Sequence, residues 1–587
     1  MLLLGIGVTL AVIGPVFAGR SAGSPQSATS LFVSPSGTDG GFCSRSAPCA
    51  TWDRAYQQAK PGQVIEVAGG TYPGQIIASR QATRNLSPGC TPATPSLCIV
   101  FRPAAGQAVV VNGPLQVNAS SVWVQGSASP ATHIPRRGRG YSIRVTGYVD
   151  TEATNANDFP DHVVLEGIAA TSFGVFDVET ALLRNMDIGP GTTGANCRVV
   201  EGPAFENRIG YAGPVAVVPR NVTLDGLIIH NQTRNADGAV SDCHIGGLFL
   251  QTANGLTIEN SVFSQNAVYN IQVQNFSDAP PATNVTIQNT LFGCPVDWVY
   301  ESGGDTRCNG QADIQFNAAS LFSNWLIRYN SFSSGLGQYV KGASYSNIRV
   351  MGNAGSRPSL CFPGMTFGYN AWVDRGCAPT DRVLQGLPFV SLAPGLEDFH
   401  LVAASPARAL VQPLSADLQL GSDIAGQTRP VRFPRDAGAL ERDTALLLPG
   451  RSIGAAAIGM SSNALRVFYG QPRASRSTKI GSKHVLARID TFAVPGGSLR
   501  ATMVGDDVVG LSTSSAFYST PKGVGPGSPF ADATRTAHAT WVPCTHAAQS
   551  ATGAVVVSYA PTAGRRRIAA VSMIRRLYVQ PCGHTRS

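Results

Sequence analysis

The feature that most constrains this chain is a short phrase that recurs through its middle. Each copy alternates apolar and polar residues over about five positions and then breaks at or beside Gly or Asn. The copies occupy 122–126, 163–167, 222–226, 256–260, 285–289, 325–329 and 348–352, and from Val222 onward they start 34, 29, 40 and 23 residues apart. This alternation predicts a short β-strand followed by a turn residue that tolerates a left-handed backbone.

A second series of short strands interleaves with the first. Its members are 248–250, 271–273, 314–316 and, more weakly, 340–342. A coil of about 23 residues with two or more strands cannot bury its own apolar face, but stacked coils can. We therefore expect a solenoid, with Ile258, Ile287 and Ile327 stacked inside. Its turn residues Asn260, Asn289 and Asn330 are expected to form an amide ladder.

A β-propeller is the alternative to a solenoid. It needs four strands per blade and a regular repeat of about 40–45 residues, whereas the spacings here are irregular and the strands shorter. The N-terminal end of the repeats also suits a solenoid, which must cover its first unpaired edge. Thr51 can N-cap a short helix over 52–59, just before a first strand at 64–67.

Two stretches of the chain resemble secreted, polysaccharide-active proteins of the right-handed parallel β-helix (pectate-lyase-like) type. The opening stretch comprises 31–39 (LFVSPSGTD), 47–52 and 61–72. The closing stretch comprises 398–401 (DFHL), 405–407, 423–426, Arg429 and 436–441 (DAGALE), and His400 within it is interpreted as structural. The resemblance spans about residues 31–442 and implies the fold. It does not select an activity, because this fold serves lyases, hydrolases, epimerases, tail-spikes and adhesins.

Composition excludes several other classes. With 64 Gly, 39 Pro and only 13% charged residues, the chain does not suit a coiled coil, and 43% apolar residues argue against disorder. Sixteen of the 44 basic residues but only four of the 35 acidic ones fall within 446–587, so this segment carries about +12 and the rest about −3. The asymmetry indicates an anionic partner for the C-terminal segment. Nucleic acid is not expected, because the long domain is acidic and no nucleic-acid-binding motif is present.

Residues 446–587 are expected to form a separate basic α+β domain. Ser461 or Ser462 can cap a helix over 464–469, and a second helix is expected over 530–539. Strands are expected at 485–492, 499–504, 508–513, 553–559 and 568–579. Residues 451–545 resemble a BamE-like or β-lactamase-inhibitor-protein-like domain of secreted actinobacterial proteins, which implies a helix pair on a small antiparallel sheet. The resemblance implies binding, helped by Arg565, Arg566, Arg567, Arg575 and Arg576; a merely solvated basic surface is the alternative.

The N-terminus predicts secretion. Leu2 to Val16 is apolar, and Val16 and Ala18 provide small residues for cleavage after Ala18, which makes 1–18 a signal peptide and 19–30 a linker. No basic residue precedes the apolar stretch, so it could instead remain as an anchor. Since no later apolar run reaches about 18 residues, no other membrane span is expected. The β-helix with its N-terminal cap is then expected over 31–445.

The cysteines agree with a secreted or cell-surface location. There are 12 and no CxxC motif, which favours disulfides in an oxidising compartment over zinc binding; free buried thiols are the alternative. Proximity suggests the pairs Cys43/Cys49, Cys90/Cys98, Cys197/Cys243, Cys294/Cys308, Cys361/Cys377 and Cys544/Cys582. The sequence does not indicate an oligomeric state.

Aligning the second strand series predicts columns of outward side chains on one face of the solenoid. The predicted columns are Phe249, Gln272, Gln315 and Lys341; Gln251, Gln274 and Asn317; and Asn270, Asp313 and Tyr339. Amide groups and an aromatic ring suit sugar hydroxyls, so we expect substrate binding by Gln251, Asn270, Gln272, Gln274, Gln315, Asn317 and Tyr339. Structural stacking of the amides between coils is the alternative.

Several residues could carry out chemistry on a bound polysaccharide. Lys341 could act as the base in β-elimination of a uronate, a reaction that often uses Ca²⁺. Ca²⁺ is therefore a candidate cofactor, although Asp297, Glu301, Asp305 and Asp313 follow no known loop pattern. Hydrolysis would need two carboxylates, for which Asp225, Asp237, Asp242 and Asp313 are candidates.

His244 beside Asp242 could be a general base or a metal ligand, unless a disulfide at Cys243 makes this a pinned loop. The sequence therefore predicts a secreted β-helix protein that binds, and could cleave as a lyase or a glycoside hydrolase, an extracellular polysaccharide or anionic wall polymer. A non-catalytic adhesive solenoid with a basic tethering domain is the alternative.

Overall fold

The structure is a computed structural model. It describes residues 29–80, 89–127, 140–153, 158–192, 207–210, 217–233, 246–266, 269–275, 279–294, 312–359, 361–392, 397–402, 405–412, 419–429, 434–441, 446–494, 496–520 and 522–579. The expected signal segment lies outside these ranges. Among the described residues, no helix combines the length and the apolar character needed to cross a membrane.

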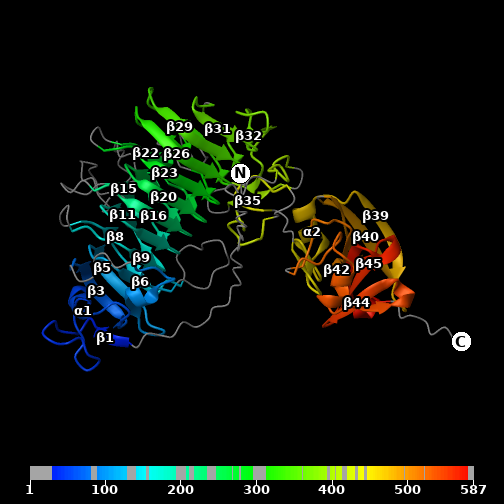
Figure 1. Ribbon diagram of the computed structural model, residues 1–587, viewed down its shortest axis with the longest axis horizontal. Helices are drawn as coiled ribbons and strands as arrows, with labels where there is room; N and C mark the ends of the chain where they lie inside the picture. Colours follow the sequence, from blue (N-terminus) through cyan, green and yellow to red (C-terminus); the bar gives the residue numbers. More distant parts are fainter. Residues whose placement is uncertain are drawn as a thin grey trace, which may run out of the picture.

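The first part of the chain winds into stacked coils whose strands pair in parallel, rung upon rung (Figure 1). Twelve strands, one from each of successive coils, form the first face. They are β1 (Thr29–Val33), β2 (Val64–Val67), β4 (Ile99–Pro103), β6 (Val122–Gln125), β9 (Val163–Glu166), β12 (Ala181–Arg184), β16 (Arg220–Asp225), β20 (Asn254–Glu259), β23 (Thr283–Gln288), β26 (Leu321–Arg328), β29 (Ser344–Met351) and β31 (Met365–Gly368).

A further 19 strands form the remaining two faces. The second face contains β7 (Ile143–Val145), β10 (Ile168–Ala170), β13 (Asp187–Ile188), β17 (Ile228–His230), β21 (Val262–Ser264), β24 (Leu291–Phe292), β27 (Ser331–Phe332), β30 (Ala354–Gly355), β32 (Ala371–Val373) and β33 (Arg382–Leu384). The third face contains β8 (Tyr148–Thr151), β11 (Ser172–Phe176), β15 (Arg208–Gly210), β19 (Leu248–Leu250), β22 (Tyr269–Val273), β25 (Ala312–Phe316) and β28 (Leu336–Gln338). The long strands β3 (Gly70–Ile77) and β5 (Val109–Val117) contribute to both faces.

The inside of the coils is filled by side chains in register. Ile258, Ile287 and Ile327 are direct neighbours on successive strands and are fully buried, as predicted. On the second face Phe263, Phe292 and Phe332 stack with ring centroids 5.2 and 4.9 Å apart. Each rung thus buries its apolar residues against the rungs above and below.

From β9 onward, a left-handed residue turns the chain at the end of each first-face strand. Asn260, Asn289 and Tyr329 have φ values of 51°, 54° and 52°, and Gly226 and Gly352 have 69° and 66°. Asn and Gly adopt this region at little cost. The predicted strand ending at a left-handed turn residue is therefore confirmed for the copies from 163–167 onward, but not for 122–126.

The amide ladder differs from the one expected. Asn289 Nδ2 donates to Asn260 Oδ1 at 2.7 Å, but Tyr329 occupies the next corner position. Asn330 belongs to a separate buried ladder, one residue further on, that runs through Asn353 and Asn370. The side-chain amides of this ladder also form hydrogen bonds with backbone groups. For example, Asn353 Nδ2 donates to the Ile327 carbonyl at 3.0 Å.

A helix covers the N-terminal end of the solenoid, and a closing segment packs along the outer side of its second face. The helix α1 (Trp52–Gln58) begins as predicted, with the backbone N–H of Arg54 donating to the Thr51 hydroxyl at 3.2 Å. The closing segment, which follows the last coil, contains the antiparallel pair β34 (Phe389–Ser391) and β35 (Asp398–Leu401). Its apolar side chains pack against Leu291, Ala354 and Ala371 of the second face.

A buried ion pair fixes the closing segment. Arg429 is fully buried, donates to Glu441 Oε2 at 2.9 Å and stacks 4.5 Å from the Tyr329 ring centroid. Burial, with repulsion from Asp436 and Asp423, raises the pKa of Glu441, while Arg429 opposes the shift. His400 lies 2.6 Å from the carboxylate of Asp398 within the same segment, which supports its structural interpretation.

The C-terminal part is an antiparallel α+β unit. Its main sheet has eight strands in the order β39 (Ala474–Ile480), β40 (Val485–Val494), β41 (Gly497–Val504), β42 (Asp507–Thr513), β46 (Ile568–Arg575), β45 (Val555–Pro561), β44 (Ala547–Thr552) and β43 (Thr540–Val542). A small sheet of β36 (Leu447–Leu448), β37 (Ser452–Ile453) and β38 (Ala456–Ala457) precedes it. The helices are α2 (Ser462–Tyr469), capped by Ser461, and α3 (Ala531–Arg535), which is shorter than expected.

The predicted fold class is confirmed: a mainly β chain with a parallel β-helix followed by a smaller α+β unit. Three predicted disulfides are present, Cys43–Cys49, Cys90–Cys98 and Cys361–Cys377. Cys294 and Cys544 are also disulfide-bonded. Cys197, Cys243, Cys308 and Cys582 lie outside the described residues.

We predict that Asn353→Ala destabilises the β-helix by about 2–4 kcal/mol, because it leaves two buried backbone groups without partners. These are the Asn330 N–H, 2.9 Å from Asn353 Oδ1, and the Ile327 carbonyl. Urea unfolding measures the change. Asn254→Ala, at an exposed asparagine that makes an amide–amide bond to Asn284, is the control and should cost well under half as much. Equal losses in the two variants would contradict the structural role of the buried ladder.

Candidate functional site

The outward side chains of the third face form two columns, which we call the polar face. The first column runs through Gln116, Asp150, Gly174, Arg208, Phe249, Gln272, Gln315 and Gly337. The apolar residues that flank these positions, such as Leu248 and Leu250, are buried in the core. Since side chains alternate along a strand, the column itself points away from the core.

The second column lies two residues further along each strand. Its members Gln251, Gln274, Asn317 and Tyr339 are held in register by backbone hydrogen bonds from each to the rung before it. For example, the Tyr339 N–H donates to the Phe316 carbonyl at 3.1 Å. The structure therefore brings Gln251, Gln274 and Asn317 together as the sequence predicted.

The predicted positions of Lys341 and Tyr339 are wrong by several residues. Strand β28 is formed by 336–338 and not by 340–342, because Leu336 fills the inward position beside Ile314. Gly337 consequently follows Gln315 in its column, and Lys341 lies in an exposed turn. Tyr339 joins the column of Gln251 instead of that of Asn270 and Asp313.

Packing explains why position 337 is a glycine. A Cβ atom there would lie 2.1 Å from Gln315 Oε1, so the Gln315 carboxamide rests over the glycine.

Asn270 and Asp313 are neighbours, as predicted, but form a closed network. Asp313 is fully buried and accepts hydrogen bonds from Asn270 Nδ2 at 2.7 Å and from the Ser334 and Gly335 N–H groups at 2.6 and 2.8 Å. The Ser333 hydroxyl also donates to it. Burial raises the pKa of Asp313 to about 7, and these bonds oppose the rise. Because both oxygens are occupied, the geometry favours a positioning role over the catalytic role predicted.

The centre of the polar face is a network of Arg, amide and aromatic groups. Arg208 donates through Nε and Nη2 to Gln251 Oε1 at 3.2 and 2.7 Å, and its guanidinium lies 5.3 Å from the Phe249 ring centroid. Gln272 Nε2 donates to Gln274 Oε1 at 2.7 Å. Most side chains of the polar face are less than a tenth exposed, namely those of Arg208, Phe249, Gln251, Gln272, Gln315 and Asn317, whereas Tyr339 is 70% exposed.

Asp150 is a candidate that the sequence analysis missed. It lies on β8 in the first column, is 1% exposed, and its Oδ2 accepts from Gln116 Nε2 at 3.3 Å. Its Oδ1 is buried without a hydrogen-bond partner among the described residues. Burial raises the pKa of Asp150 to about 7, with a further contribution from Glu152, while the bond from Gln116 opposes the rise. Burial also raises the pKa of Glu152.

A second polar group missed from the sequence lies on the second face. His230 Nε2 is 3.0 Å from Asp187 Oδ1, and its Nδ1 is 2.8 Å from Asn231 Oδ1. Both ring nitrogens are therefore occupied, which suits a structural histidine. Asp225 of the first face, a predicted hydrolysis candidate, accepts from Asn260 Nδ2 at 2.8 Å and does not belong to the polar face.

Other predicted residues lie outside the described ranges, namely Asp237, Asp242, His244, Asp297, Glu301 and Asp305. Within the described ranges, no group of three or more His, Cys, Asp or Glu side chains is arranged to hold a metal ion.

No protein-family model and no curated protein matches the sequence. Among solved structures, pectate lyase Pel9A is similar over 70% of this chain and 97% of its own, with 14% identity and a TM-score of 0.36. A rhamnogalacturonan lyase is similar over 70% and 96%, with 10% identity and a TM-score of 0.34. XylC in complex with xylose is similar over 70% and 98%, with 9% identity and a TM-score of 0.33. At these values, the likeness carries no argument about the activity of this chain.

Asp150 should make stability depend on pH. The pKa of an aspartate is ~3.9 in an unfolded chain, whereas burial raises the pKa of Asp150 in this fold to about 7. Between these values, the folded protein keeps a proton that the unfolded chain has lost, so stability falls as pH rises through this window. We therefore predict that Asp150→Asn raises the melting temperature by a few degrees at pH 8 and has little effect at pH 4.

Differential scanning calorimetry at both pH values measures this difference. Asp374→Asn, at a carboxylate that is 61% exposed, is the matched control and should show little change at either pH. A stabilisation by Asp150→Asn that is the same at pH 4 and pH 8 would contradict the elevated pKa.

Proposed function

We propose that this chain is a secreted protein that binds an extracellular polysaccharide along the polar face and hydrolyses it with Asp150 as the general acid. The observation that carries the proposal is the column register of the third face. It aligns Gln272 with Gln315, and Gln274 with Asn317 and Tyr339. Neighbouring rungs are about 4.8 Å apart, so the face repeats its polar groups at short, regular intervals along a linear polymer.

The chemistry of the face suits sugars. Carboxamides both donate and accept hydrogen bonds, as sugar hydroxyls do, and the exposed Tyr339 ring supplies a flat apolar surface. The proposed location outside the cell is supported by the three disulfides, since these persist in oxidising compartments.

The carboxylates of Asp150 on β8 and of Glu152 just after it favour hydrolysis over elimination. A general acid needs a pKa near the working pH, and that of Asp150 is raised to about 7. Glu152 lies two residues after Asp150, just past the end of β8, and two extended residues span about 6.6 Å of backbone. Separations of about 6.5–9.5 Å suit the acid and base of an inverting glycosidase. The base proposed for elimination, Lys341, lies away from the column.

Substrate cleavage can be tested on pectate, alginate, glycosaminoglycans and xylan. Release of reducing ends without an absorbing unsaturated product indicates hydrolysis. We predict that Asp150→Asn lowers the rate about 100-fold or more, the usual contribution of a general acid. Asp225→Asn on the first face is the control and should retain the rate. Full activity of Asp150→Asn, or an unsaturated product, would overturn the proposed mechanism.

Binding can be tested apart from cleavage by affinity electrophoresis. We predict that Tyr339→Ala weakens binding to the polysaccharide about tenfold, equivalent to ~1.4 kcal/mol, because the exposed ring is lost from the column. Phe42→Ala removes an aromatic side chain that is 86% exposed at the N-terminal end and should have no effect. Binding without cleavage would favour the adhesive alternative, and an equal loss in both variants would argue against the polar face.

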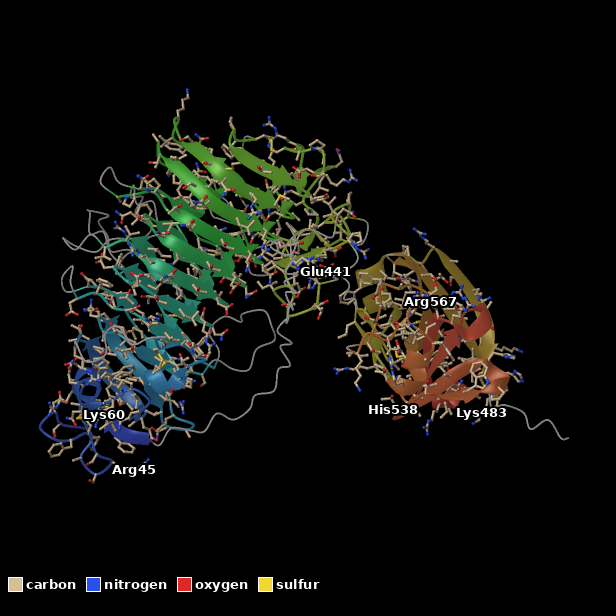
Figure 2. The ribbon with its side chains drawn as sticks, viewed as in Figure 1. Arg45, Lys60, Glu441, Lys483, His538 and Arg567 are labelled. Atoms are coloured by element: carbon tan, nitrogen blue, oxygen red, sulfur yellow. A yellow bond between two sulfur atoms is a disulfide. The ribbon has the colours of Figure 1, made fainter. Side chains whose placement is uncertain are left out.

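A second candidate function is tethering by the C-terminal domain to an anionic wall polymer. Lys479, Lys483 and Arg576 are exposed, as are Arg566 and Arg567 (Lys483 and Arg567 are labelled in Figure 2). The turn after β39 contacts the segment that follows β46, since a Cβ on Gly481 would lie 3.3 Å from the Tyr578 Cα. Lys483 and Arg576 therefore belong to neighbouring segments.

We predict that the full chain is retained on immobilised anionic wall polymer and released by salt. Replacing Lys479, Lys483 and Arg576 by Gln should lower the salt needed for release. Replacing Arg45, Lys60 and Arg357 by Gln removes the same charge from the β-helix and is the control. Retention that is insensitive to salt, or equally changed by the control, would remove the tethering function.

A further inference from the structure

A pocket lies at the corner between the first and second faces, near the N-terminal end of the β-helix. Its volume is about 550 Å³, within the range of small-molecule sites. Its walls come from the ends of β4 and β6, the turn before β5 and the turn before β7. The pocket is therefore separate from the polar face, which lies on the third face.

The pocket holds a fixed guanidinium with a free edge. Arg102 donates through Nε to Gln125 Oε1 at 2.8 Å, and both residues line the pocket. The Nη1 and Nη2 atoms of Arg102 make no hydrogen bond or ion pair with any described residue. The neighbouring carboxylate in register, Glu66, pairs instead with Arg45 at 3.4 Å. One edge of the fork is thus held while the other is available for a bidentate contact.

Three other residues of the pocket provide hydrogen-bond donors and an aromatic ring. Gln107 uses its Oε1 to accept from the Gly69 N–H, which leaves its amide hydrogens available. Ser142 Oγ accepts from the Ser127 N–H at 2.8 Å, so its own hydroxyl hydrogen can donate. Tyr141 lines the same pocket and is half-buried. The nearby carboxylates do not line the pocket: Glu66 pairs with Arg45, Glu166 with Arg184 and Asp187 with His230.

We propose that this pocket binds a carboxylate-bearing sugar unit, with the carboxylate on the Nη edge of Arg102 and the ring of the sugar beside Tyr141. A planar fork matches a carboxylate with two parallel hydrogen bonds. Gln107 and Ser142 supply donors for the hydroxyl groups. The site does not rest on the proposed function of the polar face and would bind whether or not that face cleaves a polymer.

The test is titration calorimetry of the full chain with galacturonate, galactose and acetate as separate probes. We expect galacturonate to bind. Galactose, which lacks the carboxylate, and acetate, which lacks the sugar ring, should bind at least tenfold more weakly. Arg102→Gln should lower galacturonate affinity at least tenfold, and Arg102→Lys should weaken it as well, because an ammonium cannot form the bidentate pair.

Two further variants control for charge and folding. Arg144→Gln removes an exposed cation from the nearby strand β7 without touching the pocket lining, and it should change affinity less than twofold. Ala105→Trp fills the pocket from an exposed position and should abolish binding even if Arg102 variants fail to fold. Absence of galacturonate binding, equal binding of acetate, unchanged binding in Ala105→Trp, or equal losses in the Arg102 and Arg144 variants would each overturn the proposal.

Discussion

Parallel backbone pairing between successive coils is the constraint on which the rest of this structure depends. Each strand is held one rung from the next, so a residue type that recurs at one position in the coil becomes a column in space. Ile258, Ile287 and Ile327 become a buried apolar column in this way. The same pairing aligns Gln272 with Gln315 on the outside. Core and candidate site therefore share one physical origin.

That constraint also explains which parts of the fold were predictable from sequence. First-face strands such as β20 and β23 carry a full alternating phrase that ends at a left-handed Asn, and both signals reinforce each other. The strand β28 has only Leu336, Gly337 and Gln338, with one apolar side chain. Val340 matches the local pattern equally well, so the sequence pattern slips by four residues and places Lys341 in the wrong column.

The misassigned ladder and the missed carboxylate have related causes. Tyr329 adopts the left-handed corner that Asn fills elsewhere, and the sequence does not reveal that a tyrosine would do so. The sequence pattern therefore predicts Asn330 at this corner, whereas Asn330 lies one residue beyond it in the separate ladder. Asp150 lies on a four-residue strand outside the recurring phrases. Its chemistry arises from burial and from an oxygen without a partner, which only the folded chain displays.

Whether a polar column is structural or functional depends on how its groups are satisfied. On the first face, Arg184 pairs with Glu166 at 2.8 Å, and Arg328 donates to Gln288 at 2.8 Å. These groups bond to one another between rungs and therefore have few donors and acceptors left for a ligand.

Arg102 lies in this same first-face column. The carboxylate beside it in register, that of Glu66, pairs with Arg45 and not with Arg102. Asp150 is the counterpart on the third face, where Gly174 follows it in register and offers no side chain to bond. In a solenoid built from self-satisfying ladders, the interruptions of a ladder are where binding energy is left for other molecules. This places the candidate chemistry at Asp150 and Arg102, and not at the longest runs of polar residues.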